Sequence, residues 1–202
     1  MSPDACCINR LRPGPAIDGP PVGSAMILGL SKQQFQSMWA GVFALYPGAE
    51  DLRMTERYLE DFAVGQTYGS GRFQIDEKRI KSFASEFDPQ PFHLDAAAAR
   101  HTIFQGLVAS GWHTAAVTMR LLVESELRPA GGIVGAGLDE LRWPRPVRPG
   151  DELNIECEVL EVRPSKSRPD FGLIKVRMTT LNQNREAVLV SVGNLLVPRR
   201  PK

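Results

Sequence analysis

Cysteine is scarce in this 202-residue chain, and its three cysteines suggest neither a set of disulfides nor a metal site. Cys6 and Cys7 are adjacent in a stretch rich in Pro and Gly, and Cys157 lies in an alternating segment. This spacing matches neither the CxxC pairs of a metal site nor the even sets of cysteine that cross-link small secreted domains. We therefore expect no disulfide framework, no structural metal and a cytoplasmic location.

Net charge is also nearly absent, because 24 Lys and Arg residues balance 23 Asp and Glu residues to leave +1. Such a chain has no global field that would draw it onto nucleic acid or an anionic membrane. Long hydrophobic runs are missing as well. The apolar patches at 25–30 and 35–46 are too short or too polar for the ~20 residues of a membrane span. We expect neither nucleic acid nor a membrane as a partner.

The first 53 residues differ in composition from the rest of the chain. They hold six Pro and six Gly, a composition that favours solvation over packing. We predict a disordered extension at 1–53 and one domain at 54–202. Because Met54 stands where the domain begins, we further hypothesise that translation starts there, which the intact mass of the native protein would test.

The first half of the predicted domain reads as one strand and two helical segments. Residues 65–75 read as extended. Asp76 is a plausible N-cap, and the apolar residues that follow it recur at helical spacing up to Phe87. The two prolines at 89 and 91 end this helix. Residues 95–101 can form another turn or two of helix.

The second half predicts a long helix and then a set of strands. Residues 106–127 are apolar around nearly the whole helix, so we expect it to be buried, with Trp112 and Met119 in the core. The alternative for these two side chains is the lining of a pocket. Strands are predicted at 153–159, 174–178 and 188–197, the last apolar on both faces like a central strand. Pro149 and Gly150 suit a type II turn before the first of them.

These elements predict an α+β domain with a hot-dog fold, in which an antiparallel sheet wraps around one long central helix. Such a sheet has few other elements to cover it. We therefore expect a homodimer, or a dimer of dimers, in which two sheets or two helices meet.

One short segment presents a carboxylate and an imidazole on a stiff turn. Asp88 and His93 are five residues apart, and Pro89 and Pro91 lie between them. A carboxylate beside a histidine can hold one water molecule and transfer its protons near neutral pH. The alternative is structural: Asp88 caps a turn and His93 is a half-buried histidine with its hydrogen bonds satisfied.

Three motifs carry a resemblance to a known family. Residues 88–95 read Asp-Pro-Gln-Pro-Phe-His-Leu-Asp, residues 106–112 read Gly-Leu-Val-Ala-Ser-Gly-Trp, and residues 142–151 end in a Pro-Gly-Asp turn. From about 57 to 197 the chain resembles the MaoC-like hot-dog proteins, which include (R)-specific enoyl-CoA hydratases and acyl dehydratases. The family's loop reads D-x-N-P-x-H-x-D, and its helix opens on His-Gly. Gln90 and Ser110 depart from this pattern.

The resemblance implies reversible hydration of a 2-enoyl thioester, with an acyl-CoA as substrate and no separate cofactor. Asp88 and His93 would hold the water, and the Gly111 N–H would bind the thioester oxygen at the positive end of the helix. Gln90 would fix the loop through its amide, or touch the substrate or the water. Ser110 would cap the helix or bond to the thioester, the water or Asp88.

The phosphates of CoA require local positive charge. Arg142, Arg145 and Arg148 form one candidate group, and Lys166 with Arg168 forms another. The alternative for each residue is ordinary solvated charge.

The alternatives to hydration are a thioesterase, a binding subunit and a metal site. A hot-dog thioesterase would attack the carbonyl carbon instead of the β-carbon. The departures at Gln90 and Ser110 leave room for a non-catalytic acyl-CoA binding subunit. A metal site formed by His93, His101 and His113 is disfavoured, because no two of these residues have the i,i+4 spacing of a helical pair.

Overall fold

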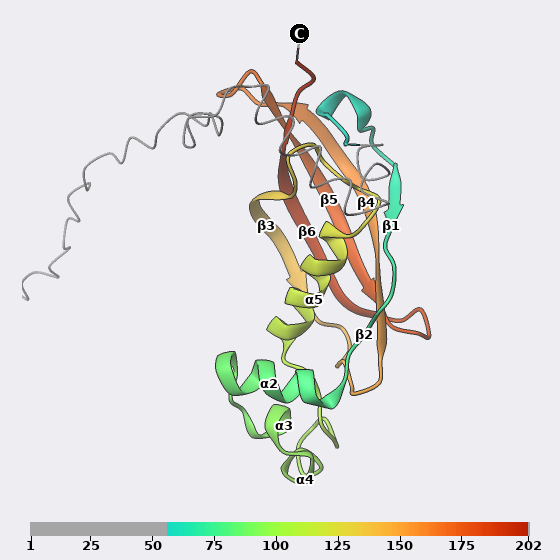
Figure 1. Cartoon of the computed structure of the whole chain (residues 1–202), viewed down its shortest axis with the longest axis vertical. Coiled ribbons are helices and arrows are strands. Elements are labelled where there is room, and N and C mark those ends of the chain that lie inside the picture. The colour runs from blue at the N-terminus through green and yellow to red at the C-terminus, as the bar shows by residue number, and fades with distance from the viewer. Residues whose placement is uncertain (1–55, 202) are drawn as a thin grey trace, which may run out of the picture. The chain divides into compact units, whose positions relative to one another are not determined.

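The computed structural model describes residues 56–201, so the predicted extension at 1–53 and the start at Met54 lie outside the described residues. In these residues no helix is long and apolar enough to cross a membrane. Figure 1 shows the elements, which follow in the order η2 (Leu59–Asp61), β1 (Thr67–Gly69), β2 (Phe73–Gln74), α2 (Glu77–Phe87), α3 (Pro91–Leu94), α4 (Ala96–Ala99), α5 (Gly111–Val123), β3 (Val134–Arg142), β4 (Glu152–Pro164), β5 (Phe171–Leu181) and β6 (Ala187–Pro198).

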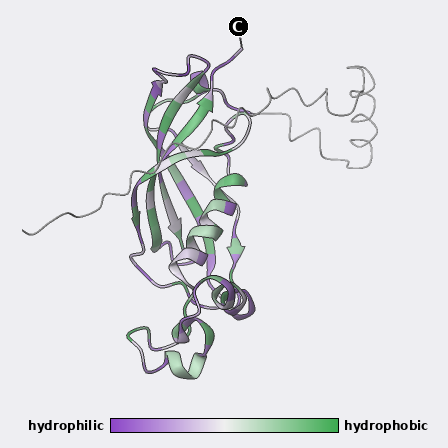
Figure 2. Cartoon of the chain, turned by 90° about the vertical axis from the view of Figure 1, so that its left-hand side faces the viewer, coloured by the Kyte–Doolittle hydropathy of each residue, from purple (hydrophilic) through white to green (hydrophobic). Residues whose placement is uncertain are grey.

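The strands form an antiparallel sheet in the order β1-β4-β5-β6-β3, and β2 also pairs with β4. The three strands predicted from alternation are β4, β5 and β6, which lie side by side as a meander. β6 lies between two partners, as its two apolar faces predict. Hydrophobic and hydrophilic residues are interspersed along these strands in Figure 2. The predicted turn before β4 is also confirmed, with Gly150 at φ 95°.

Sequence pattern does not predict β3, the strand at one end of the sheet. Residues 134–139 are all exposed, and two of them are glycines. The pairing with β6 also shifts register twice, between Gly135 and Gly137 and between Leu138 and Glu140. Bulges and an exposed edge remove the strict alternation on which a strand prediction depends.

The extended segment predicted at 65–75 is two short strands. The chain runs four residues from Gly69 in β1 to Phe73 in β2, whereas their partners in β4, Glu156 and Leu153, are only three residues apart. One extra residue therefore interrupts the pairing with β4. The Ser70 hydroxyl accepts a hydrogen bond from the Ile155 N–H at 3.0 Å, which satisfies the β4 backbone at this interruption.

Two of the helices around the 88–95 loop, α2 and α4, begin directly after an aspartate that caps them. The Asp76 carboxylate accepts from the Arg79 N–H, and α2 ends at Phe87 as predicted. Pro91 then starts α3, because a proline needs no N–H acceptor at a first helical position. The sequence pattern did not predict this helix. The Asp95 carboxylate caps α4, which is shorter than the predicted 95–101.

The long helix α5 is shorter than the predicted 106–127. Gln105 and Gly106 have positive φ angles of 54° and 159°, so the chain turns there instead of starting a helix. Ser110 is the N-cap, and its hydroxyl accepts from the Trp112 N–H at 3.2 Å.

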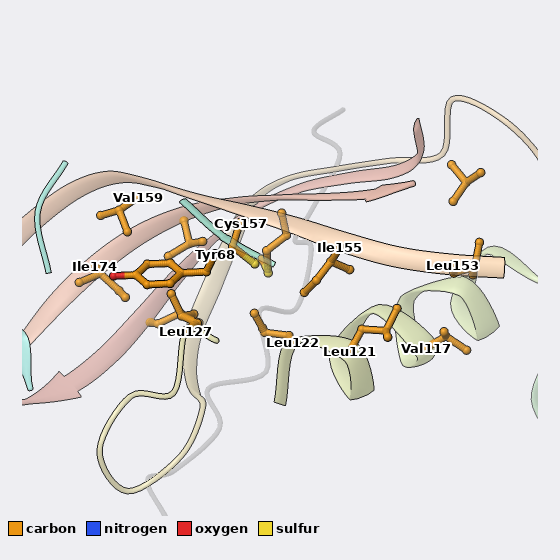
Figure 3. Packing of buried hydrophobic residues seen from close by; sticks show 14 of the residues in the cluster. Tyr68, Val117, Leu121, Leu122, Leu127, Leu153, Ile155, Cys157, Val159 and Ile174 are labelled. Carbon is orange, nitrogen blue, oxygen red and sulfur yellow. The ribbon is translucent and has the colours of Figure 1, made fainter. Parts of the chain in front are cut away.

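One face of α5 packs against the sheet and forms the core. Figure 3 shows Val117, Leu121 and Leu122 facing Leu153 and Ile155 of β4, and all five are at most 5% exposed. Burying each such side chain contributes about 1.5–3 kcal/mol before the entropy of ordering is subtracted. The predicted arrangement of a sheet around one helix is confirmed.

The opposite face of α5 is exposed. Trp112, Met119 and Val123 are 60%, 50% and 61% exposed. The prediction that α5 is buried all round, with Trp112 and Met119 in the core, is therefore wrong for the single chain. Hydrophobic periodicity cannot distinguish a face that packs on the chain's own sheet from one left for a partner.

Candidate active site

An open cavity of about 540 Å³ lies at the start of α5. Its lining comes from the end of α2, from α3, from the segment before α5, from the first turn of α5 and from residues 143–147 after β3. Asp88, Gln90, His93 and Gly111 line this cavity, and all four are predicted site residues. Ser110, also predicted at the helix start, is not among the lining residues.

Asp88 and His93 face each other in this cavity. Their atoms Oδ2 and Nε2 are 3.4 Å apart, and the two side chains are 19% and 6% exposed. The other ring nitrogen of His93, Nδ1, is 2.8 Å from the carbonyl oxygen of Val108. A carbonyl oxygen only accepts, so Nδ1 carries the proton. In the neutral ring, Nε2 is then an acceptor directed toward Asp88.

The Asp88 carboxylate is held in its ionised form. Its Oδ2 accepts a hydrogen bond of 2.6 Å from the Ser110 hydroxyl, and its Oδ1 accepts one of 2.7 Å from the Gln90 amide. Ser110 makes the largest contribution that lowers the pKa of Asp88 below its ordinary value; Gln90 and the nearby His93 lower it further, while burial opposes them.

The contacts of Ser110 and Gln90 show which of their suggested roles they fill. Ser110 fills two of them, because its hydroxyl caps α5 by accepting from the Trp112 N–H and also donates to Asp88. Gln90 fixes the loop through its amide, and it also lines the cavity. Both residues therefore act on the Asp88 carboxylate.

Gly111 is the first residue of α5 and lies against the indole of Trp143. Its N–H has no acceptor within the helix, as for any first-turn amide, and it lies at the positive end of the helix dipole. The Trp143 Nε1–H donates to the Gly111 carbonyl at 2.8 Å. A Cβ atom at position 111 would be only 3.0 Å from the indole, so any larger residue would press on the ring.

Of the three predicted arginines, Arg142, Arg145 and Arg148, one lines the cavity. Arg145 lines the cavity, with its Nε 3.3 Å from a carboxylate oxygen of Glu186. Arg142 pairs with Glu140 on its own strand, and the Arg148 guanidinium donates to the Phe104 carbonyl at 2.7 Å. Neither of these two lines the cavity. Lys166 and Arg168 lie in the turn between β4 and β5, also outside the cavity lining.

The other histidines and Cys157 are outside the cavity lining too. His101 is exposed, whereas His113 is 7% exposed and stacks on Phe83 with ring centroids 4.7 Å apart. Burial, with a smaller effect of Arg79, lowers the pKa of His113. Among residues 56–201, no group of His, Cys, Asp and Glu could hold a metal ion. Burial raises the pKa of the Cys157 thiol to about 12, which leaves it a poor nucleophile.

Sequence reasoning missed three features of the site. The carbonyl that fixes His93 belongs to the main chain of Val108, so no residue type could reveal it. Trp143 lies within a motif used for the resemblance, but nothing in the motif shows that its ring reaches Gly111. Phe92 and Phe104 form an aromatic wall, with centroids 5.2 Å apart, that only the fold brings together.

Comparison with known proteins identifies the family. A family model described as the MaoC-like domain matches residues 61–180, more than half of the chain. This chain belongs to the MaoC-like family. It is 31% identical to the uncharacterized protein YdeM of Bacillus subtilis (strain 168) over 141 residues, which is 70% of this chain and 99% of YdeM.

Solved structures of similar proteins share the fold. A MaoC-like dehydratase from Rhodospirillum rubrum is 57% identical, with a TM-score of 0.70 over 72% of this chain and 99% of that one. The R-hydratase PhaJ1 from Pseudomonas aeruginosa is 29% identical, with a TM-score of 0.56 over 71% of this chain and 86% of PhaJ1. The predicted family and the hot-dog fold are confirmed.

Proposed function

We propose that this MaoC-like protein reversibly adds water to the 2,3 double bond of an enoyl thioester, with an acyl-CoA as its substrate and no separate cofactor. One observation carries the proposal: two acceptor atoms, Oδ2 of Asp88 and Nε2 of His93, are 3.4 Å apart in a cavity that also contains the first amide of α5. The likeness to a MaoC-like dehydratase and to an R-hydratase supports the same chemistry.

The two acceptors suit a single water molecule, which has two protons to donate. Because Ser110 and Gln90 lower the pKa of Asp88, its carboxylate is a weak base. Nε2 of His93 carries no proton in the neutral ring, so it can accept the proton of the water. We assign His93 as the general base and Asp88 as the group that orients the water and stabilises the imidazolium ion.

The bond changes balance with these groups alone. The water oxygen bonds to the β-carbon as His93 takes the proton, and the C=C electrons move toward the thioester oxygen. The Gly111 N–H donates to that oxygen, a kind of interaction whose loss typically costs ~3 kcal/mol. The Nε2–H of His93 then delivers the proton to the α-carbon on the same face. Dehydration follows the same steps in reverse.

The CoA end of the substrate needs a cation at the cavity mouth. Arg145 lines the cavity and fits this role. Its existing partner, Glu186, is also at the surface, with the two side chains 50% and 42% exposed, so solvent weakens their interaction. We assign Arg145 to the CoA phosphates and leave Arg142 and Arg148 as weaker candidates.

A second copy of the chain would cover the exposed face of α5. Three large apolar side chains there, Trp112, Met119 and Val123, are at least 50% exposed, and Trp112 also lines the cavity. Large apolar side chains gathered on one helix face favour a protein partner. We therefore propose a homodimer whose interface borders the active site.

A direct assay uses the purified protein and enoyl-CoA esters of graded length. Hydration removes the absorbance of the conjugated double bond and releases no thiol. Asp88→Asn and His93→Ala should each lower the rate by about 10²–10⁴-fold, whereas the matched surface variants Asp170→Asn and His101→Ala should retain it. Release of free CoA thiol would indicate a thioesterase instead, and binding without turnover at every chain length would indicate a non-catalytic subunit.

A further inference from the structure

The indole of Trp143 contacts Gly111 in two ways. Its Nε1–H donates to the Gly111 carbonyl at 2.8 Å. A Cβ atom at Gly111 would lie 3.0, 3.2 and 3.3 Å from three atoms of the indole, so the face of the ring covers the α-carbon. Both residues line the cavity, although Trp143 follows β3 and Gly111 begins α5.

The start of α5 is thus held from two directions. Ser110 donates to Asp88 at the end of α2, and Gly111 accepts from Trp143. The ring of Trp112 supports the indole edge-on, with centroids 5.7 Å apart. A glycine left unsupported at a helix start has more backbone freedom than any other residue. These contacts remove that freedom at the residue whose N–H is assigned to the thioester oxygen.

We propose that Trp143 is a positioning residue that fixes the Gly111 amide for the developing charge on the thioester oxygen, an inference that rests on the proposed function. A donor in such a site must lie 2.7–3.1 Å from the charged oxygen, and small misplacements reduce the rate steeply. The ring contact acts on the Gly111 α-carbon, which lies in the same peptide plane as the Gly111 N–H. The hydrogen bond holds the Gly111 carbonyl in the next peptide plane, and the φ and ψ angles of Gly111 join the two planes.

The kinetic test separates positioning from substrate binding. Trp143→Phe keeps an aromatic ring but lacks the Nε1–H donor. We expect kcat to fall about three- to tenfold, the effect of one neutral hydrogen bond, while KM changes less than about twofold. An unchanged kcat would overturn the inference. So would a rise in KM alone, because it would assign Trp143 to substrate binding.

A stability test examines the same contact without any substrate. Gly111→Ala places a methyl group against the indole, so it should lower Tm by about 2–10 °C in the wild-type background. In a Trp143→Ala background that loss should disappear, since the clashing ring is gone. Trp143→Leu replaces Trp143→Ala if the latter does not fold. The matched control Gly135→Ala, which meets nothing within 4 Å, should show no dependence on position 143.

The two tests distinguish failure of this inference from failure of the proposed function. Wild-type protein that hydrates no enoyl thioester would refute the function, and the positioning role of Trp143 with it. Normal hydration by Trp143→Phe would leave the function standing and refute the inference. Equal effects of Gly111→Ala in both backgrounds would refute the packing contact on which it depends.

Discussion

Replacing Ser110 by Ala removes two interactions at once, and the structure sets the size of the effect. Loss of the helix cap through Trp112 typically costs ~1 kcal/mol. Loss of a hydrogen bond to a carboxylate costs about 1.5–3 kcal/mol when buried. The Asp88 side chain is 19% exposed, so water compensates for part of the second loss. We expect a total of about 2 kcal/mol, or a fall in Tm of about 4–8 °C.

The same substitution changes the ionisation of Asp88. Ser110 is the largest influence that lowers the pKa of Asp88, so its removal should raise that pKa. NMR titration of the Asp88 carboxyl carbon in Ser110→Ala and Ser110→Thr tests this, with the Thr hydroxyl restoring the wild-type pKa, and calorimetry measures the loss of stability. A pKa of Asp88 that Ser110→Ala leaves unchanged would refute the role of this hydrogen bond.

Three further predictions follow from particular residues. Arg145→Ala should raise KM for a CoA ester but leave KM for the matching pantetheine thioester unchanged, because the shorter substrate lacks the phosphates. Burial lowers the pKa of His113, so the folded state binds fewer protons than the unfolded state and stability falls as the pH drops below 6.5. His113→Phe should flatten this pH dependence of Tm in thermal melts. An unchanged slope would assign the dependence to other groups. Met119→Glu should convert a dimer to a monomer in light scattering, and an unchanged mass would place the interface elsewhere.

Local sequence determines much of the fold and of the 88–95 loop. The alternation in β4 and β5 and the spacing after Asp76 follow directly from which face of each element is buried. The two prolines and Asp88 mark the end of α2 in the same way, because their effects act on neighbouring residues. These features are predictable since the forces that produce them act within a few residues.

Other features depend on contacts between segments far apart in the chain. Ser110 reaches Asp88 across 22 positions, and Trp143 reaches Gly111 across 32. Neither residue type nor spacing indicates such a pairing. The exposed face of α5 differs from the prediction for a related reason: hydrophobic periodicity does not show which face of a helix packs on the chain's own sheet.

The central claim is that Asp88 and His93 hold one water molecule that adds to the β-carbon of an enoyl thioester. Mass spectrometry of the product formed in H₂¹⁸O tests it most directly. We predict ¹⁸O in the 3-hydroxyl group of an intact hydroxyacyl thioester, with the rate of incorporation about 10²–10⁴-fold lower in Asp88→Asn. Appearance of ¹⁸O in a free carboxylate, with release of the thiol, would contradict the claim.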